Sequence, residues 1–277
     1  MQHKSLFVFD IETVPDTDSV QNLTGFSDPN VTERRAELER YHLEITQGKN
    51  AFPRHPLHRV VAISFLEAEI EYFGGQERYY LKELRSGGEQ GFSEDQLLQG
   101  FFQYFEHLKP RLVSFNGRAF DLPVLKYRAM AHGIAAPWLY SSGDKWNSYQ
   151  SRYSIDWHCD LLDVLRDYGA SSPVKLAEIC AVMGFPGKFG WDGSQVTNMI
   201  DAGKIQEVRD YCETDVLNTY LVYLRSMLHR GVISRDGYNR SVSDIITMIE
   251  NSRTTRPHLF DFLEAWGLAS KNTFLLE

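Results

Sequence analysis

The first apolar run of the chain extends from Leu6 to Ile11, is interrupted by Asp10 and ends at Glu12. An apolar run of this length between polar residues is typical of a strand that is buried on both faces. Side chains alternate along a strand, so Asp10 and Glu12 project from the same face. The pattern therefore predicts a central strand that carries two acids on one side of its carboxyl end.

Shorter apolar runs predict the other strands. The turn signal Gly74-Gly75 separates two of them, so we expect an antiparallel meander in this part of the chain. The predicted strands after the first are Val60–Phe65, Ile70–Phe73, Arg78–Leu84, Arg111–Phe115 and Ile155–Leu161.

Helical patterns lie between and after these strands. Ser93 and Gln96 form a capping-box pattern that opens a helix ending near Leu108, before Pro110. Because a helix between two strands allows a crossover connection, we expect an α/β protein in which parallel strands join the meander. The other predicted helices are Val31–Gln47 with Thr32 as its N-cap, Pro123–His132, Ser172–Met183, Lys204–His229, Ser243–Glu250 and Pro257–Trp266.

The composition is that of an ordinary globular protein, with 43% hydrophobic and 24% charged residues. No repeat or linker divides the 277 residues, so we expect residues 1–277 to form a single domain. The cysteines Cys159, Cys180 and Cys212 lie far apart, which predicts reduced thiols in the core of a cytoplasmic protein. No apolar run has the length of a signal peptide or a membrane span.

The formal net charge of −8 argues against a surface that is coated with basic residues for nucleic acid. It leaves open a local groove in which metal ions face nucleic acid, because divalent ions offset the charge of acidic ligands. Charge therefore excludes only general electrostatic binding over the whole surface.

The acids at strand ends are the first candidates for chemistry. Two carboxylates side by side at the end of a buried strand repel each other and lose hydration, and a divalent cation between Asp10 and Glu12 would offset both costs. A pair that reaches the surface needs no ion, so this alternative stays open. A third acid, Asp121, follows the strand Arg111–Phe115, where it is either an ordinary helix cap or a further ligand.

The fourth candidate acid, Asp215, belongs to the long predicted helix Lys204–His229. Tyr211 lies one turn earlier and points in the same direction. A carboxylate on the inward face needs either a cation or a hydrogen-bonding or basic partner. On a helical wheel Asp215 falls among inward-facing residues, away from the polar side formed by Gln206, Asp210, Glu213 and Asn218.

Three segments, in this order, resemble the motifs of the DEDD exonuclease family: Asp10-Ile11-Glu12, Asn116–Asp121 and Tyr211–Asp215. Tyr211, four residues before the last acid, is similar in position to the tyrosine that marks the DEDDy branch of this family. Phe185–Lys188 and Asp192–Val196 further resemble stand-alone 3'-5' exonucleases related to the proofreading domain of family-B DNA polymerases. The resemblance extends from about Leu6 to Trp266.

This resemblance implies a ribonuclease H-like fold, with a mixed five-stranded sheet flanked by helices. It also implies a metal-dependent 3'-5' exonuclease that uses two Mg²⁺ or Mn²⁺ ions, the hard cations that oxygen ligands hold. The resemblance implies that Tyr211 orients the attacking water by a hydrogen bond. It would not deprotonate that water, because a tyrosine is too weak a base at neutral pH. The implied ligands of the ions are Asp10, Glu12, Asp121 and Asp215.

The resemblance also implies a substrate, which is DNA or RNA with a free 3' end, preferably single-stranded. The products would be nucleoside 5'-monophosphates. Asn116 and Phe120 would lie near the terminal nucleotide, where an aromatic ring can stack on a base. Arg118 and Lys188 are either phosphate contacts or ordinary surface charges.

Two other functions stay open. A catalytically silent nucleic-acid-binding module would keep the same fold and motifs. A phosphatase of the haloacid dehalogenase type also opens with an apolar strand and two acids, but its second acid is Asp, whereas this chain has Glu12. His158-Cys159-Asp160 is not expected to bind zinc, because adjacent strand residues point to opposite faces and no second ligand pair has suitable spacing.

Overall fold

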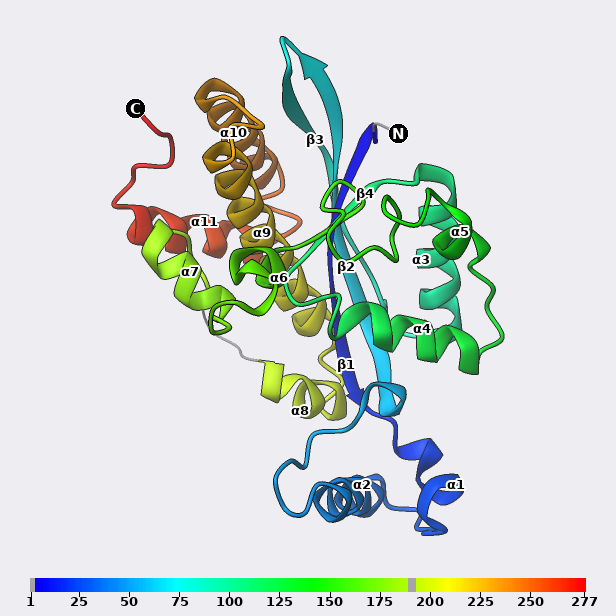
Figure 1. The fold of residues 1–277 in the computed structure, drawn as a ribbon. Coiled ribbons are helices and arrows are strands. Elements are labelled where there is room, and N and C mark those ends of the chain that lie inside the picture. Colours follow the sequence, from blue (N-terminus) through cyan, green and yellow to red (C-terminus); the bar gives the residue numbers. More distant parts are fainter. Residues whose placement is uncertain (1–2, 189–192) are drawn as a thin grey trace.

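A five-stranded sheet forms the centre of the computed structural model, which describes residues 3–188 and 193–277 (Figure 1). The strand order is β3-β2-β1-β4-β5. β2 is antiparallel to both β1 and β3, whereas β4 is parallel to β1 and to β5, so the predicted mixed sheet is confirmed. The strands are β1 (Ser5–Pro15), β2 (His58–Phe73), β3 (Gln76–Gly87), β4 (Arg111–Ser114) and β5 (His158–Asp160).

The predicted meander contains a hairpin of two strands rather than three strands. The stretches Val60–Phe65 and Ile70–Phe73 belong to the single strand β2, so the predicted break between them is wrong. The alternation continues across this region, where Leu66 and Ala68 are buried and Glu67 between them is only partly buried. The turn at Gly74-Gly75 is confirmed, and both glycines have positive φ.

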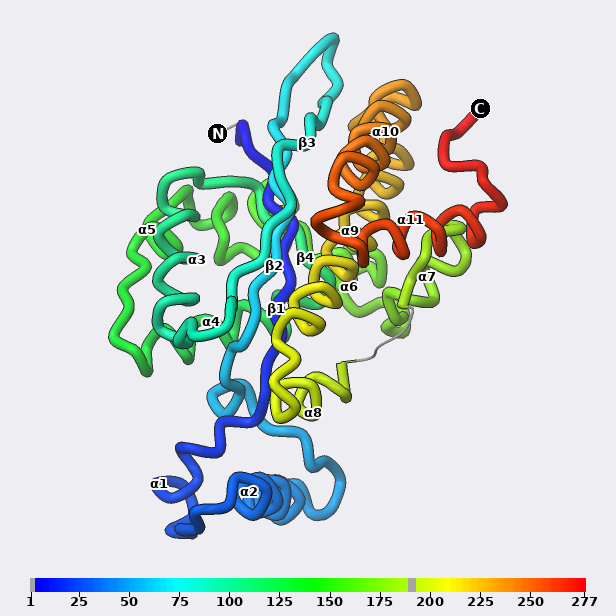
Figure 2. The backbone as a smooth tube through the Cα atoms, turned by 180° about the vertical axis from the view of Figure 1, so that it is seen from behind, coloured from blue at the N-terminus to red at the C-terminus, as the bar shows by residue number. Residues whose placement is uncertain are grey.

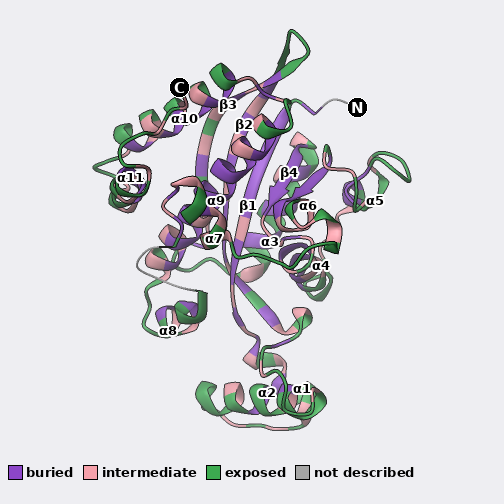
Figure 3. Ribbon diagram, turned by 60° about the vertical axis from the view of Figure 1, so that its left-hand side comes forward, coloured by how far each residue is buried: buried purple, intermediate pink, exposed green. Residues whose placement is uncertain are grey.

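Helices cover both faces of the sheet (Figures 1 and 2). α3, α4 and α5 lie on one side, and α7, α9, α10 and α11 lie on the other. α1 and α2 extend beyond the end of β1 as a helical arm, residues 16–57, which is largely exposed in Figure 3. The helices are α1 (Val20–Thr24), α2 (Val31–Ile45), α3 (Glu94–Leu108), α4 (Asp121–Ala131), α5 (Pro137–Ser141), α6 (Leu161–Leu165), α7 (Leu176–Met183), α8 (Val196–Asp201), α9 (Ile205–His229), α10 (Arg235–Asn251) and α11 (Pro257–Ser270).

Some of the predicted helix N-termini are confirmed and others are wrong. The capping box at Ser93 is present, as predicted. Thr32 is not the cap of α2, because the Asn30 side chain accepts a hydrogen bond from the Thr32 amide at 2.9 Å. Asp121 is not a cap either, since it is the first residue of α4 and Phe120 precedes it as the N-cap. α7 starts at Leu176, later than predicted, and α10 starts earlier, at Arg235.

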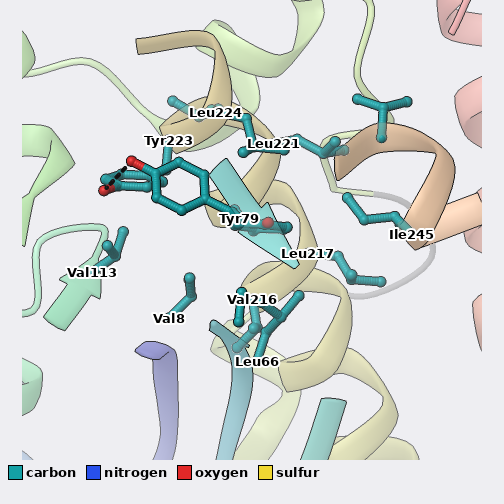
Figure 4. Packing of buried hydrophobic residues seen from close by; sticks show 14 of the residues in the cluster. Val8, Leu66, Tyr79, Val113, Val216, Leu217, Leu221, Tyr223, Leu224 and Ile245 are labelled. Atoms are coloured by element: carbon teal, nitrogen blue, oxygen red, sulfur yellow. Dashed lines mark hydrogen bonds between the residues drawn. The ribbon is translucent and has the colours of Figure 1, made fainter. Parts of the chain in front are cut away.

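Alternation along β1 divides the apolar core into two clusters. Phe7, Phe9 and Ile11 pack with α3 and α4, whereas Leu6 and Val8 pack with α9 and α10. Figure 4 shows the second cluster, in which Val8 and Leu66 of the sheet lie opposite Val216, Leu217 and Leu221 of α9. Asp10 and Glu12 continue the series of Leu6 and Val8, so they face α9.

α9 is enclosed more completely than its sequence pattern predicts. Glu213 and Asn218, expected on its polar side, are 5% and 0% exposed. The prediction is wrong here because α7, α10 and α11 cover the sides of α9 that face away from the sheet. Glu213 pairs with Arg256 and hydrogen-bonds His258 and Ser86, which compensates the buried charge.

Two further expectations concern the whole molecule. The three cysteines are buried and free of disulfides, as predicted. Within residues 3–188 and 193–277, no helix combines the length and apolar character needed to cross a membrane.

Candidate active site

The acids predicted from separate segments meet where β1 extends beyond β4. β4 pairs with β1 from Leu6 to Val8 and ends at Ser114, so the following residues of β1 do not pair with β4. α4 begins in this region and α9 packs across β1 (Figure 1). The acids brought together are Asp10 and Glu12 of β1, Asp121 at the start of α4 and Asp215 in the middle of α9.

Burial and mutual repulsion dominate the electrostatics of these acids. Burial raises the pKa of Asp10 well above its ordinary value, and the charges of Asp121, Glu12 and Asp215 raise it further. The pKa of Glu12 is also raised by burial and by Asp215, while Lys188 opposes the shift. Without a bound cation, burial and mutual repulsion therefore favour the protonated forms of these carboxylates.

Asp121 connects the start of α4 to β1. Its carboxylate accepts hydrogen bonds from the backbone amides of Ile11 and of Asp121 itself, which places it next to the Asp10–Glu12 pair. Burial raises the pKa of Asp121 to about 7, although both amides act in the opposite direction. Asp160 contributes further repulsion. The side chain is 4% exposed, so water does little to stabilise its charge.

One carboxylate oxygen of Asp215 has no hydrogen-bond partner among the described residues. Its Oδ1 atom is buried and accepts no hydrogen bond from any of the described residues. Burial raises the pKa of Asp215, whereas Lys188 and a hydrogen bond with Tyr211 lower it. A buried carboxylate oxygen without a donor is costly, and a cation beside it would remove that cost.

Tyr211 and Lys188 form the edge of the site on the α9 side. Lys188 Nζ donates a hydrogen bond to the Tyr211 hydroxyl at 2.7 Å and lies 5.4 Å from the ring centre. Burial, followed by the charges of Asp215, Glu12 and Asp10, raises the pKa of Tyr211 above its ordinary value. The tyrosine is therefore a neutral hydroxyl that can both donate and accept hydrogen bonds.

Asn218 fixes the backbone just before Lys188. Its side chain accepts a hydrogen bond from the Gly187 amide at 3.1 Å and donates one to the Gly187 carbonyl at 2.9 Å. The helical wheel places Asn218 on a polar face and does not predict this contact with Gly187. Asp192, part of the motif that follows, lies outside the described residues.

Cys212, which its sequence context predicts only as a core residue, lies next to the acids. Its thiol lies 3.5 Å from both the backbone oxygen and the Oδ2 atom of Asp10. Potential ligand atoms of Asp10, Glu12 and Cys212 all lie within 4.8 Å of one another. Burial and the nearby acids raise the pKa of the thiol well above its ordinary value, so Cys212 remains a neutral donor to Asp10.

Asp160 shapes the turn that leads into α4, a role that its sequence context did not reveal. Its carboxylate accepts hydrogen bonds from the Asn116 amide at 2.9 Å and the Arg118 amide at 2.8 Å. Asn116 has a φ of 69°, a left-handed conformation that asparagine tolerates better than most residues. A Cβ atom at Gly117 would lie 2.5 Å from the Ser114 hydroxyl, so the turn packs closely on β4.

A cavity of about 530 Å³ opens beside Glu12, between the sheet and the helical arm. Phe120 forms part of its wall, and its ring packs edge-on against His58 with ring centres 5.0 Å apart. Phe52 and Leu38 supply the arm side of the cavity. The arm is held to α8 by two hydrogen bonds from Arg35 to Asp201, at 2.9 and 3.1 Å.

Comparison with known proteins identifies the class to which this fold and site belong. A family model described as a predicted 3'-5' exonuclease related to the exonuclease domain of PolB matches residues 50–266. The chain therefore belongs to this family, and its mixed sheet flanked by helices is a ribonuclease H-like fold. No curated protein matches the chain.

Family membership implies a nuclease that acts on nucleic acid, and exonucleases of this kind typically use divalent metal ions. Asp121, Tyr211 and Asp215 lie within the matched range, whereas Asp10 and Glu12 lie before it. Although Asp10 and Glu12 lie outside the matched range, the structure brings them together with Asp121 and Asp215. The haloacid dehalogenase alternative receives no support from this family.

Proposed function

We propose that the protein is a DEDDy 3'-5' exonuclease that uses two Mg²⁺ or Mn²⁺ ions to remove nucleoside 5'-monophosphates from DNA or RNA, preferably single-stranded. The observation that carries this proposal is the convergence of Asp10, Glu12, Asp121 and Asp215 in one buried cluster. We also propose that residues 1–277 form one exonuclease domain.

The donor set fits hard divalent cations. All four acids offer carboxylate oxygens, the ligand type that Mg²⁺ and Mn²⁺ prefer. The unpartnered Oδ1 atom of Asp215 and the repulsion around Asp10 are costs that bound cations would remove. When bound, such ions activate water and stabilise the leaving 3'-oxygen of a phosphodiester.

Tyr211 and Lys188 would act directly on the reacting groups. A neutral Tyr211 hydroxyl can orient the attacking water by a hydrogen bond, but it cannot remove the proton of that water at neutral pH. Lys188, 2.7 Å from this hydroxyl, would offset negative charge on the scissile phosphate.

The cavity between β1 and the helical arm supports the recognition of a chain end. With a volume of about 530 Å³, it lies within the range of pockets that hold small ligands, and both Glu12 and Phe120 line it. We propose that the terminal nucleotide enters here and that Phe120 contacts its base. Asn116 would lie on the neighbouring turn, where Asp160 holds its backbone.

The test is a cleavage ladder on 5'-labelled single-stranded DNA and matched RNA, with Mg²⁺, Mn²⁺ or EDTA. We expect stepwise shortening from the 3' end, which EDTA, Asp10→Asn and Asp215→Asn each abolish. Asp261→Asn, a substitution at an exposed acid of α11, is the matched control and should leave the ladder unchanged. The ratio of DNA to RNA rates identifies the preferred polymer.

Two results would contradict the proposal. Folded protein that binds both metals and cleaves neither polymer would favour the silent binding module. Internal cuts, or shortening that survives both substitutions, would place the chemistry outside this cluster.

A further inference from the structure

Arg118, in the turn that positions Asp121, interacts electrostatically with two other cations, and we call these three residues the cation row. The charge of Arg118 acts on both Lys126 of α4 and Arg152 of the segment between α5 and β5. Burial lowers the pKa of Lys126, and Arg118 lowers it further. Like charges that interact in this way are unfavourable unless an anion joins them.

The acids in this region do not neutralise the whole row. Asp163 pairs with Arg152 through two hydrogen bonds, at 2.7 and 2.6 Å. Asp160 interacts with Arg118, but its oxygens also accept backbone amides of the turn. Among the described residues, Lys126 has no carboxylate partner.

The Arg118 guanidinium makes few hydrogen bonds to the described part of the chain. It donates one long hydrogen bond, 3.3 Å from Nη2 to the Ser151 carbonyl. Its Nε atom is buried and has no acceptor among residues 3–188 and 193–277. A guanidinium that donates so few hydrogen bonds, beside a cation with no carboxylate partner among the described residues, is suited to a phosphate group.

Exposed aromatic rings flank the row at both ends. Lys126 lies 5.8 Å from the ring centre of Tyr140, which is 60% exposed. At the other end Arg152 lies 5.9 Å from the ring centre of Tyr168, which packs edge-on against Tyr153 at 4.8 Å. Tyr153 is 68% exposed. Exposed rings beside cations are a surface on which unpaired bases can stack.

Hydrogen bonds connect the segments that carry the two ends. Arg118 contacts Ser151, and Gln150 next to it donates a hydrogen bond to the Leu139 carbonyl at 3.3 Å, beside Tyr140. Lys126 lies five residues after Asp121 in α4, which is about 7.5 Å along the helix axis. We call this surface the basic-aromatic belt; its residues are Arg118, Lys126, Tyr140, Arg152, Tyr153 and Tyr168, in the segments coloured green in Figure 1.

We propose that the basic-aromatic belt binds the single-stranded nucleotides that precede the 3'-terminal one, with phosphates on the cations and bases on the tyrosines. This inference rests on the proposed exonuclease function, and it adds a second contact region outside the acid cluster and the terminal-nucleotide cavity. It predicts that the enzyme distinguishes long single strands from very short ones.

The experiment compares the wild-type protein with the double variant Lys126→Gln/Tyr140→Ala. The matched control is Arg78→Gln/Phe73→Ala, another cation and exposed ring, 4.3 Å apart at the far tip of the β2–β3 hairpin. Binding of fluorescein-labelled 12-nucleotide oligothymidylate and oligouridylate is measured by anisotropy in EDTA over a range of salt. Turnover of the same oligomers and of dinucleotides is measured with Mn²⁺.

We expect the belt variant to bind the 12-nucleotide oligomers about tenfold more weakly, the loss typical of one stacked base. The slope of log affinity against log salt should fall by about 0.7, the value for one phosphate contact on a single strand. KM for these oligomers should rise while kcat and dinucleotide turnover stay unchanged. The hairpin control should match the wild type throughout.

Other results separate the belt from the exonuclease itself. Unchanged binding, salt slope and KM in the belt variant, with the ladder intact, would overturn the belt and leave the exonuclease in place. Loss of dinucleotide turnover as well would also overturn it, because the substitutions would then act on the acid cluster. A folded wild-type protein that neither binds nor shortens any oligomer would refute both proposals.

Discussion

Neutralising Asp121 should stabilise the metal-free protein. Burial raises the pKa of Asp121 from 3.8 to about 7. Because the folded state holds this proton more tightly than the unfolded chain, stability is lost as the pH rises from about 4 to about 7. At about 1.4 kcal/mol per pH unit, the full loss is about 4 kcal/mol at pH 8. Asp121→Asn removes the charge that causes this loss.

The assay is urea unfolding in EDTA at pH 5 and pH 8. We expect Asp121→Asn to raise the free energy of unfolding by up to about 4 kcal/mol at pH 8, and by less than half as much at pH 5, where the wild-type carboxyl is still largely protonated. The exposed Asp261→Asn should change stability by less than about 0.5 kcal/mol at either pH.

With Mn²⁺ at pH 8, the wild type should have a higher free energy of unfolding than Asp121→Asn, the reverse of the order in EDTA. Metal that binds only the folded state stabilises it by mass action, and the wild type keeps a ligand that the variant lacks. The reasoning would be refuted if Asp121→Asn were as stable as the wild type, or less stable, in EDTA at pH 8. That result would mean that hydrogen bonds already compensate the buried charge.

Two substitutions test residues around the acids. Tyr211→Phe removes the hydroxyl that accepts a hydrogen bond from Lys188, so we expect kcat to fall about 100-fold with KM nearly unchanged in steady-state cleavage; an unaltered kcat would exclude Tyr211 from the reaction. In Asp160→Asn the new NH2 group faces the backbone amide of either Asn116 or Arg118, which then has no acceptor. We therefore expect thermal unfolding to show a free energy of unfolding lower by about 1–3 kcal/mol, and kcat to fall at least tenfold. Normal values of both would show that the turn keeps its shape without that carboxylate.

Local patterns predicted β1 and its acids because the relevant physics is local. The apolar run defines a buried strand, and its period of two places Asp10 and Glu12 on one face whatever packs against it. The same reasoning failed to decide the role of Asp121. Its position after a strand suits a cap, and only the path of the turn makes it the first residue of α4 next to Ile11.

Residues whose partners are distant in the sequence were missed. Asp160 lies in a short strand, and nothing around it indicates that it binds amides more than 40 residues earlier. Cys212 looks like a core residue until α9 is laid across β1. The helical wheel misplaced Glu213 and Asn218 because a wheel assumes one solvent-facing side, whereas α9 is covered on several.

Buried charges are usually paired with opposite charges, but the acid cluster gathers like charges away from water. Its surroundings include a neutral thiol, a neutral tyrosine and apolar side chains of the α9 core, and Lys188 is the cation that lowers the pKa of both Glu12 and Asp215. A buried ion pair that serves stability loses stability when one member is neutralised, because the other charge is left alone. Neutralising one acid of a repelling cluster has the opposite effect. The sign of the stability change in the metal-free Asp121→Asn variant therefore distinguishes a cluster kept for binding cations from one kept for the fold.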